Sequence, residues 1–80
     1  MNTLLKQLVE AHGPSGFEDQ VRALIHAEIA PFADEVSVDS MGNLIAVKHG
    51  QGDGLKIMIA AHMDEIGVMV SHISKDGFLR

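Results

Sequence analysis

The chain has 80 residues, a formal net charge of −5, no cysteine and a hydrophobic fraction of 46%. This apolar fraction is too high for a disordered chain, and the absence of cysteine excludes disulfides and thiolate metal sites. The negative charge argues against a nucleic-acid partner, which would need lysine and arginine to neutralise phosphates. No apolar run approaches the ~20 residues of a membrane span, and the first residues lack the pattern of a secretory signal. We therefore expect a cytoplasmic globular segment with no nucleic-acid or membrane partner.

Two helices are expected in the first 30 residues. The first helix is indicated by apolar residues at helical spacing within the first ten positions, and Gly13-Pro14 ends it. Ser15 and Glu18 then match a capping box, in which the hydroxyl and the carboxylate satisfy each other's backbone donors. The second helix is expected from about residue 17 to the residue before Pro31. Its apolar face contains Val21, Leu24 and Ile25.

After Pro31 the apolar pattern changes from helical to alternating, which indicates strands. Residues 36–38 and 44–47 are expected to form a hairpin around the turn at 39–43, where Gly42 and Asn43 tolerate a positive φ.

The most apolar segment, residues 55–61, is continuous rather than alternating. This pattern is typical of a strand that is buried on both faces. We therefore predict a mixed sheet with this segment at its centre, covered by the second helix, and with Ile57 and Ile59 among the most buried residues.

Residues 66–73 indicate a further strand, and Lys75-Asp76-Gly77 predicts a tight turn. The partner strand begins at Phe78 and has three residues. Such a hairpin is unfinished and leaves an exposed apolar edge. We therefore expect a cut chain rather than a natural terminus, and expect the short chain to associate, to be only partly ordered or to depend on other chain segments.

An imidazole and a carboxylate follow the apolar segment 55–61, two positions apart. Because side chains alternate along a strand, His62 and Asp64 are expected to point the same way. Ligands gather outside the carboxyl ends of strands in open α/β sheets, and a carboxylate beside a metal-binding histidine orients the ring. The spacing alone leaves two interpretations open: a metal ligand with its supporting carboxylate, or a strand end followed by a turn.

Other chemistries find little support in the sequence. There is no His-Glu-x-x-His pattern, and neither Ser15 nor Ser40 lies in the Gly-x-Ser-x-Gly elbow of hydrolases. The glycine-rich loop at 49–54 lacks the Lys-Ser/Thr pair of a phosphate loop. A catalytic metal normally has about three protein ligands, whereas His62 is the one good candidate here. The remaining histidines are interpreted as structural or solvated: His12, His26, His49 and His72.

Three segments nevertheless resemble successive motifs of one enzyme family: Gly13–Glu18, Asp39–Leu44 and Ala61–Gly67. Their order and spacing are similar to those of the dinuclear metallo-aminopeptidases that form tetrahedral dodecamers, the glutamyl or deblocking aminopeptidases. Some members of this family are labelled endoglucanase or cellulase. The resemblance covers nearly the whole chain.

The resemblance implies a phosphohydrolase-like or zinc-peptidase-like α/β catalytic domain, of which residues 1–80 are a part cut within a hairpin near an inserted dimerisation domain. It implies that His62 is a metal ligand and that Asp64 is the acidic catalytic residue that orients it. It further implies two divalent metal ions (zinc, cobalt or manganese), a bridging water, a glutamate general base beyond residue 80, peptide substrates and a dodecamer. The 80-residue chain alone is then expected to be an inactive part of an aminopeptidase.

Two other interpretations remain. A glycosidase needs two carboxylates across a sugar-binding cleft, and this chain offers no isolated carboxyl pair and no Trp or Tyr to stack on a sugar. A small structural or interaction module without enzymatic activity would use the same motifs as a cap, a turn and a strand.

Overall fold

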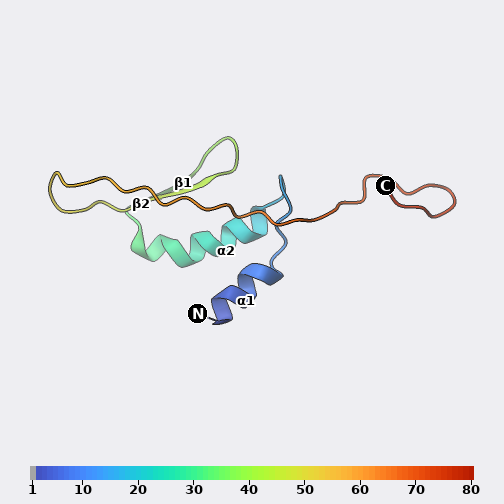
Figure 1. The fold of residues 1–80 in the computed structure, drawn as a ribbon, viewed down its shortest axis with the longest axis horizontal. Helices are drawn as coiled ribbons and strands as arrows, with labels where there is room; N and C mark the ends of the chain where they lie inside the picture. The colour runs from blue at the N-terminus through green and yellow to red at the C-terminus, as the bar shows by residue number, and fades with distance from the viewer. Residues whose placement is uncertain (1) are drawn as a thin grey trace.

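The first half of the chain forms a small α/β unit in the computed structural model, which describes residues 2–80. Its elements, in chain order, are α1 (Asn2–Glu10), α2 (Asp19–Ile29), the 3-10 turn η1 (Ala30–Phe32), β1 (Glu35–Val38) and β2 (Leu44–Val47) (Figure 1). Within the described residues, no helix is long and apolar enough to cross a membrane.

A tight turn, rather than a capping box, leads into α2. The Phe17 amide donates to the Pro14 carbonyl at 2.9 Å, and Gly16 has φ +85°, as the third residue of a type II turn requires. Glu18 does reach back, because its Oε1 accepts from the Gly16 amide at 2.7 Å. The Ser15 hydroxyl, however, makes no helix cap. The predicted reciprocal cap is therefore wrong, although the helix that follows is present.

The predicted hairpin is confirmed. Strands β1 and β2 pair antiparallel, with Glu35 opposite Val47 and Val38 opposite Leu44. The turn between them is organised by the Asp39 carboxylate, which accepts hydrogen bonds from the Met41 and Asn43 amides and from the Asn43 side chain. Gly42 has φ +87°, whereas Asn43 does not take a positive φ.

Arg22 connects α2 to this hairpin. Its Nε donates to the Gly42 carbonyl at 2.9 Å, and its Nη1 lies 2.6 Å from Asp19 Oδ1. The Arg22 side chain is only 16% exposed, so the guanidinium fills the space between the helix and the turn. The guanidinium is suited to this position because its planar fork can donate in two directions at once.

The core of this unit is small. Val21 of α2 is 5% exposed and packs against the buried backbone of Gly13. The helix faces around them are half-buried, with Leu4, Leu8, Leu24 and Ile25 among their members. The predicted apolar face of α2 is therefore the buried one, but little chain covers it.

The predicted central strand is not found. Residues 55–61 are extended, and within residues 2–80 no backbone hydrogen bond reaches them. Ile57 is 82% exposed and Ile59 is 92% exposed, so the prediction that they are among the most buried residues is wrong. The sheet is antiparallel and two-stranded rather than mixed. The physical reason is that a strand is buried on both faces only when other strands lie beside it and helices cover it. Among residues 2–80, no strand pairs with the segment at 55–61.

The C-terminal part of the chain extends away from the helices. Figure 1 shows it as an orange to red trace that runs along the molecule and ends in a projecting loop. The radius of gyration is 17.3 Å, and the extents are 65 × 30 × 16 Å. A compact chain of this length would have a radius of gyration of about 12 Å.

The last ten residues form the predicted turn but only a minimal hairpin. The Gly77 amide donates to the Ser74 carbonyl at 3.1 Å, and Gly77 has φ +84°. Ile73 and Leu79 form an isolated antiparallel bridge, and the Arg80 amide donates to the His72 carbonyl. The Ser71 and His72 amides both donate to the Arg80 carbonyl, and the backbone of residues 66–70 makes no hydrogen bond within residues 2–80.

Candidate functional site

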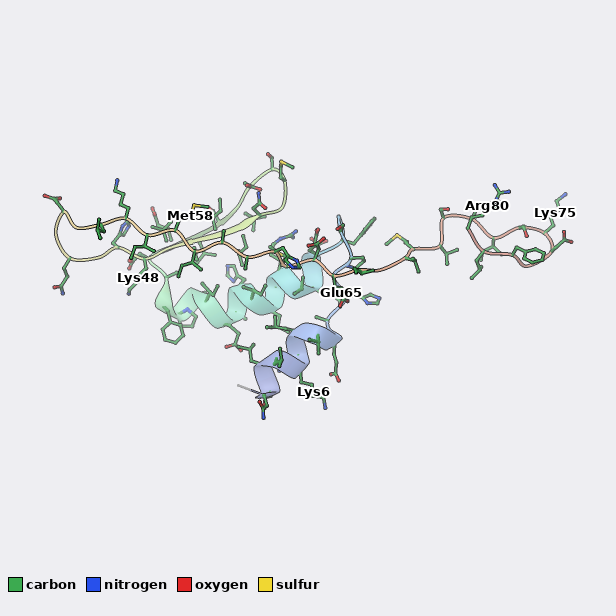
Figure 2. All side chains as sticks on the ribbon, in the orientation of Figure 1. Lys6, Lys48, Met58, Glu65, Lys75 and Arg80 are labelled. Carbon is green, nitrogen blue, oxygen red and sulfur yellow. The ribbon has the colours of Figure 1, made fainter. Side chains whose placement is uncertain are left out.

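The candidate site forms where the extended C-terminal part meets the loop between α1 and α2. The Glu65 amide donates to the Gly13 carbonyl at 2.8 Å, and Pro14 and Glu65 form an isolated parallel bridge. Gly67 lies so close that a Cβ there would be 3.1 Å from Pro14 Cβ. In Figure 2 the labelled Glu65 lies beside the N-terminal end of α2. This bridge fixes the backbone three residues after His62.

The His62 and Asp64 side chains meet, as the alternation of strand side chains predicts. His62 Nδ1 lies 3.0 Å from Asp64 Oδ1 and 3.0 Å from the Asp64 backbone carbonyl oxygen. The imidazole is 84% exposed, while the Asp64 side chain is 38% exposed. The ring is therefore held on one side and open to solvent on the other.

These two contacts define the tautomer of His62. A carbonyl oxygen and an ionised carboxylate can only accept hydrogen bonds, so the ring nitrogen that faces both must carry a proton. With the proton on Nδ1, the neutral imidazole has its lone pair on Nε2. Among residues 2–80, no hydrogen bond occupies Nε2. The neutral ring thus presents a free lone pair to solvent, which is the state in which histidine binds metals.

Ser15 is the third member of the cluster. Its hydroxyl donates to Asp64 Oδ2, so the two carboxylate oxygens have different partners: Oδ1 faces His62 and Oδ2 faces Ser15. The pKa of Asp64 is lowered, first by the hydrogen bond from Ser15 and then by the one from His62. The carboxyl group is therefore ionised at neutral pH.

The cluster borders a depression of about 350 Å³. One side is lined by the turn before α2, with Pro14, Ser15 and Phe17. The other side is lined by the C-terminal segment, including His62, Asp64 and Met69. The open imidazole, an ionised carboxylate and apolar surface are thus presented together.

The donor set fits a metal ion only in part. A ligating histidine whose other nitrogen donates to a carboxylate is the usual arrangement in metal sites, and the Asp64–His62 pair has this arrangement. In the part of the chain that the structure describes, however, no three His, Asp or Glu side chains gather closely enough to hold a metal. The described residues therefore fit one ligand position and not a complete metal centre.

The other histidines lie away from this cluster. His12, which follows α1, and His26 in α2 are not buried, and His72 is exposed at the edge of the C-terminal hairpin. His49 Nε2 is 3.8 Å from Glu35 Oε2 beside the open end of β1 and β2. None of them adds a ligand at His62. Glu65 is the other carboxylate next to Asp64 in the sequence, and it is its backbone amide that binds the Gly13 carbonyl.

Comparison with known proteins shows which class of protein this chain resembles. A model of the M42 glutamyl aminopeptidase family matches residues 42–80, which include β2 and the His62–Asp64 pair. A putative aminopeptidase of Acetivibrio thermocellus is 55% identical over 80 residues, which is 100% of this chain and 24% of that protein. The lysyl aminopeptidase of Pyrococcus furiosus is 49% identical over 78 residues, or 96% of this chain and 22% of that protein.

The backbone has the same relationship. A crystal structure of a TET aminopeptidase from the marine sediment archaeon Thaumarchaeota archaeon SCGC AB-539-E09 superposes with a TM-score of 0.86 and 46% sequence identity, over 98% of this chain and 22% of that one. The class of protein that these relatives share is thus that of the aminopeptidases. The chain belongs to the M42 aminopeptidase family, as an N-terminal segment. It spans about a quarter of the length of the relatives it matches.

Proposed function

We propose that this chain is the N-terminal segment of a metal-dependent aminopeptidase that removes N-terminal residues from peptides. In this proposal His62 supplies one metal ligand through Nε2, and Asp64 orients the ring. The observation that carries the proposal is the geometry at Nδ1, which faces two acceptors and leaves the Nε2 lone pair open to solvent. The similarity to aminopeptidases over almost the whole chain supports the reaction class.

The residues of this chain supply orientation and charge to such a site. The bridge between Pro14 and Glu65 fixes the backbone next to the imidazole, and the ionised Asp64 stabilises the ring in one tautomer. A bound divalent cation, which we expect to be zinc, cobalt or manganese, would polarise a carbonyl and make a nucleophile from water at neutral pH. Two such ions, the remaining ligands and the general base belong, in this proposal, to the longer protein.

The same proposal places the enzyme in the cytoplasm as a homo-oligomer, a dodecamer in its complete form, and takes the 80-residue chain alone to be inactive. The absence of cysteine fits a reducing compartment. The match to a TET aminopeptidase supports assembly of the complete protein.

The test is made on the longer protein that contains this segment. His62→Ala should remove a direct ligand and abolish both bound metal and release of an N-terminal residue from a short peptide. Asp64→Asn keeps the shape but loses the charge, and should lower metal affinity or rate by ~10–100-fold. Metal content is measured by elemental analysis of the purified protein, alongside turnover of the peptide.

His26→Ala is the matched control, because His26 lies on α2, away from the cluster. It should leave metal content and turnover unchanged. Full metal occupancy and normal turnover in His62→Ala would make His62 a structural strand-end residue and would favour a non-enzymatic role for the segment. The 80-residue chain, assayed in the same way, should show no turnover.

A further inference from the structure

The hydrogen bond from Ser15 to Asp64 joins residues that are 49 positions apart in the sequence. Ser15 is the second residue of the type II turn before α2, where the backbone is fixed by the bond between Phe17 and Pro14. The bridge between Pro14 and Glu65 brings this turn alongside the segment that carries Asp64. The turn before α2 thus places the Ser15 hydroxyl beside the Asp64 carboxylate of the C-terminal segment.

Asp64 needs a second partner to hold its orientation. Its side chain is 38% exposed, and rotation about its bonds is not blocked by a packed core. The His62 ring is 84% exposed and cannot itself immobilise the carboxylate. Oδ2 receives a hydrogen bond only from Ser15 in the described part of the chain, while Oδ1 faces His62. Loss of the Ser15 hydroxyl would free the carboxylate to turn away from the ring.

We propose that Ser15 is a positioning residue for the metal ligand: its hydroxyl holds the Asp64 carboxylate, and through it the orientation and tautomer of His62. This inference rests on the proposed function of His62 and adds a residue to it. Ser15 touches neither metal nor substrate in this role. It acts on metal affinity by restricting the imidazole to the orientation in which Nε2 faces outward, as partners of ligating residues do elsewhere.

The experiment uses the longer protein, stripped of metal and titrated with Zn²⁺ in competition with a chromophoric chelator. Ser15→Ala should weaken Zn²⁺ binding by ~10-fold or more. Ser15→Thr retains a hydroxyl at a position where the turn accepts a β-branched residue, and should restore affinity to near the wild-type value. Ser40→Ala, in the exposed hairpin turn, removes a hydroxyl that makes no hydrogen bond within residues 2–80 and should change nothing.

Turnover at limiting and at saturating Zn²⁺ provides the second measurement. Ser15→Ala should lose turnover at limiting Zn²⁺ and recover most of it at saturation, because the ligand itself is intact. Wild-type affinity in Ser15→Ala, or equal weakening in Ser15→Ala and Ser15→Thr, would overturn the inference. If His62→Ala abolishes metal binding while Ser15→Ala does not weaken it, only this inference fails. If His62→Ala binds Zn²⁺ normally, the proposed function itself fails.

Discussion

Gly13 lies where two parts of the molecule approach each other closely. A Cβ at this position would lie 3.0 Å from Val21 Cγ1, which is tighter than ordinary carbon contact, and 3.7 Å from the Met63 carbonyl oxygen. The same glycine accepts the hydrogen bond from Glu65 that docks the candidate site. The absence of a side chain at Gly13 therefore lets Val21 pack on one side and lets the segment that carries the candidate site approach on the other.

We predict that Gly13→Ala destabilises the protein and that the loss depends on Val21. Val21→Ala alone should lower the free energy of unfolding by about 2 kcal/mol, because it removes buried methyl groups from a small core. In the Val21→Ala background the methyl group added at position 13 would find room, so the double variant should lose less stability than the sum of the two single losses. Denaturant unfolding of the four proteins of this double-mutant cycle measures the coupling. Strict additivity would show that the close approach of Gly13 and Val21 has no energetic consequence.

At this scale the sequence predicts the His62–Asp64 pair but not its third member. The pair is found because strand alternation is a local rule that covers two positions. The local pattern assigns Ser15 to a cap on α2, because a serine three residues before a glutamate at the start of an apolar helix is typical of a capping box. The structure directs the same hydroxyl to Asp64. The two residues are 49 positions apart, so no local sequence pattern predicts this hydrogen bond.

The hairpin of β1 and β2 depends on charge at its turn. The Asp39 carboxylate accepts from two backbone amides and from the Asn43 side chain, and these bonds lower the pKa of Asp39. At the open end, the Asp34 carboxylate accepts from the His49 amide, which lowers the pKa of Asp34. Both groups are therefore more acidic in the folded hairpin than in an unfolded chain.

The hairpin should consequently lose stability in acid. A carboxyl group whose pKa is depressed in the folded state stabilises that state above its unfolded pKa of about 4, and this contribution disappears as the pH falls through the folded value. Amide exchange of residues in β1 and β2 should be protected at neutral pH and lose protection below about pH 4. Asp39→Asn should weaken protection at neutral pH and flatten the acid response of the turn. An unchanged acid response in this variant would show that Asp39 does not control the hairpin.

Both helices, this hairpin and the C-terminal turn could be predicted because their signals are local: apolar periodicity, Pro and Gly at the ends, and turn residues between short strands. The segment at 55–61 shows the limit. Its composition correctly marks it as extended and apolar, but whether it is buried depends on which strands lie beside it. Ile57 and Ile59 are 82% and 92% exposed because no such strands are present among residues 2–80.

The whole molecule presents an unusual amount of apolar surface. Ile66 and Val68 are fully exposed, Ile57 and Ile59 are mostly exposed, and the extended backbone of this region has unpaired donors and acceptors. Exposed apolar segments of this size mark surfaces that are covered in the functional state. The match to a TET aminopeptidase, of which this chain covers 22%, supports covering by the rest of a longer protein.

We therefore predict that the 80-residue chain alone associates at high concentration. Sedimentation velocity should show species larger than a monomer, in proportions that rise with concentration. The double variant Ile57→Lys and Ile59→Lys places charges on the exposed segment and should reduce association, since charged residues on strand edges oppose pairing. A monodisperse, well-ordered monomer of the unmodified chain would contradict the prediction.

The bond between Ser15 and Asp64 also fixes an order of events in time. During synthesis at ~5–20 residues per second, the 49 positions that separate the two residues require roughly 2–10 s. Helices α1 and α2 and the hairpin form from neighbouring residues on timescales of microseconds. The loop that presents Ser15 thus exists before its partner has been made. Closing a loop of this length also costs more conformational entropy than forming the local elements. The His62 imidazole therefore acquires its orientation late in folding, when the segment that carries Asp64 has been synthesised and pairs with the turn that carries Ser15.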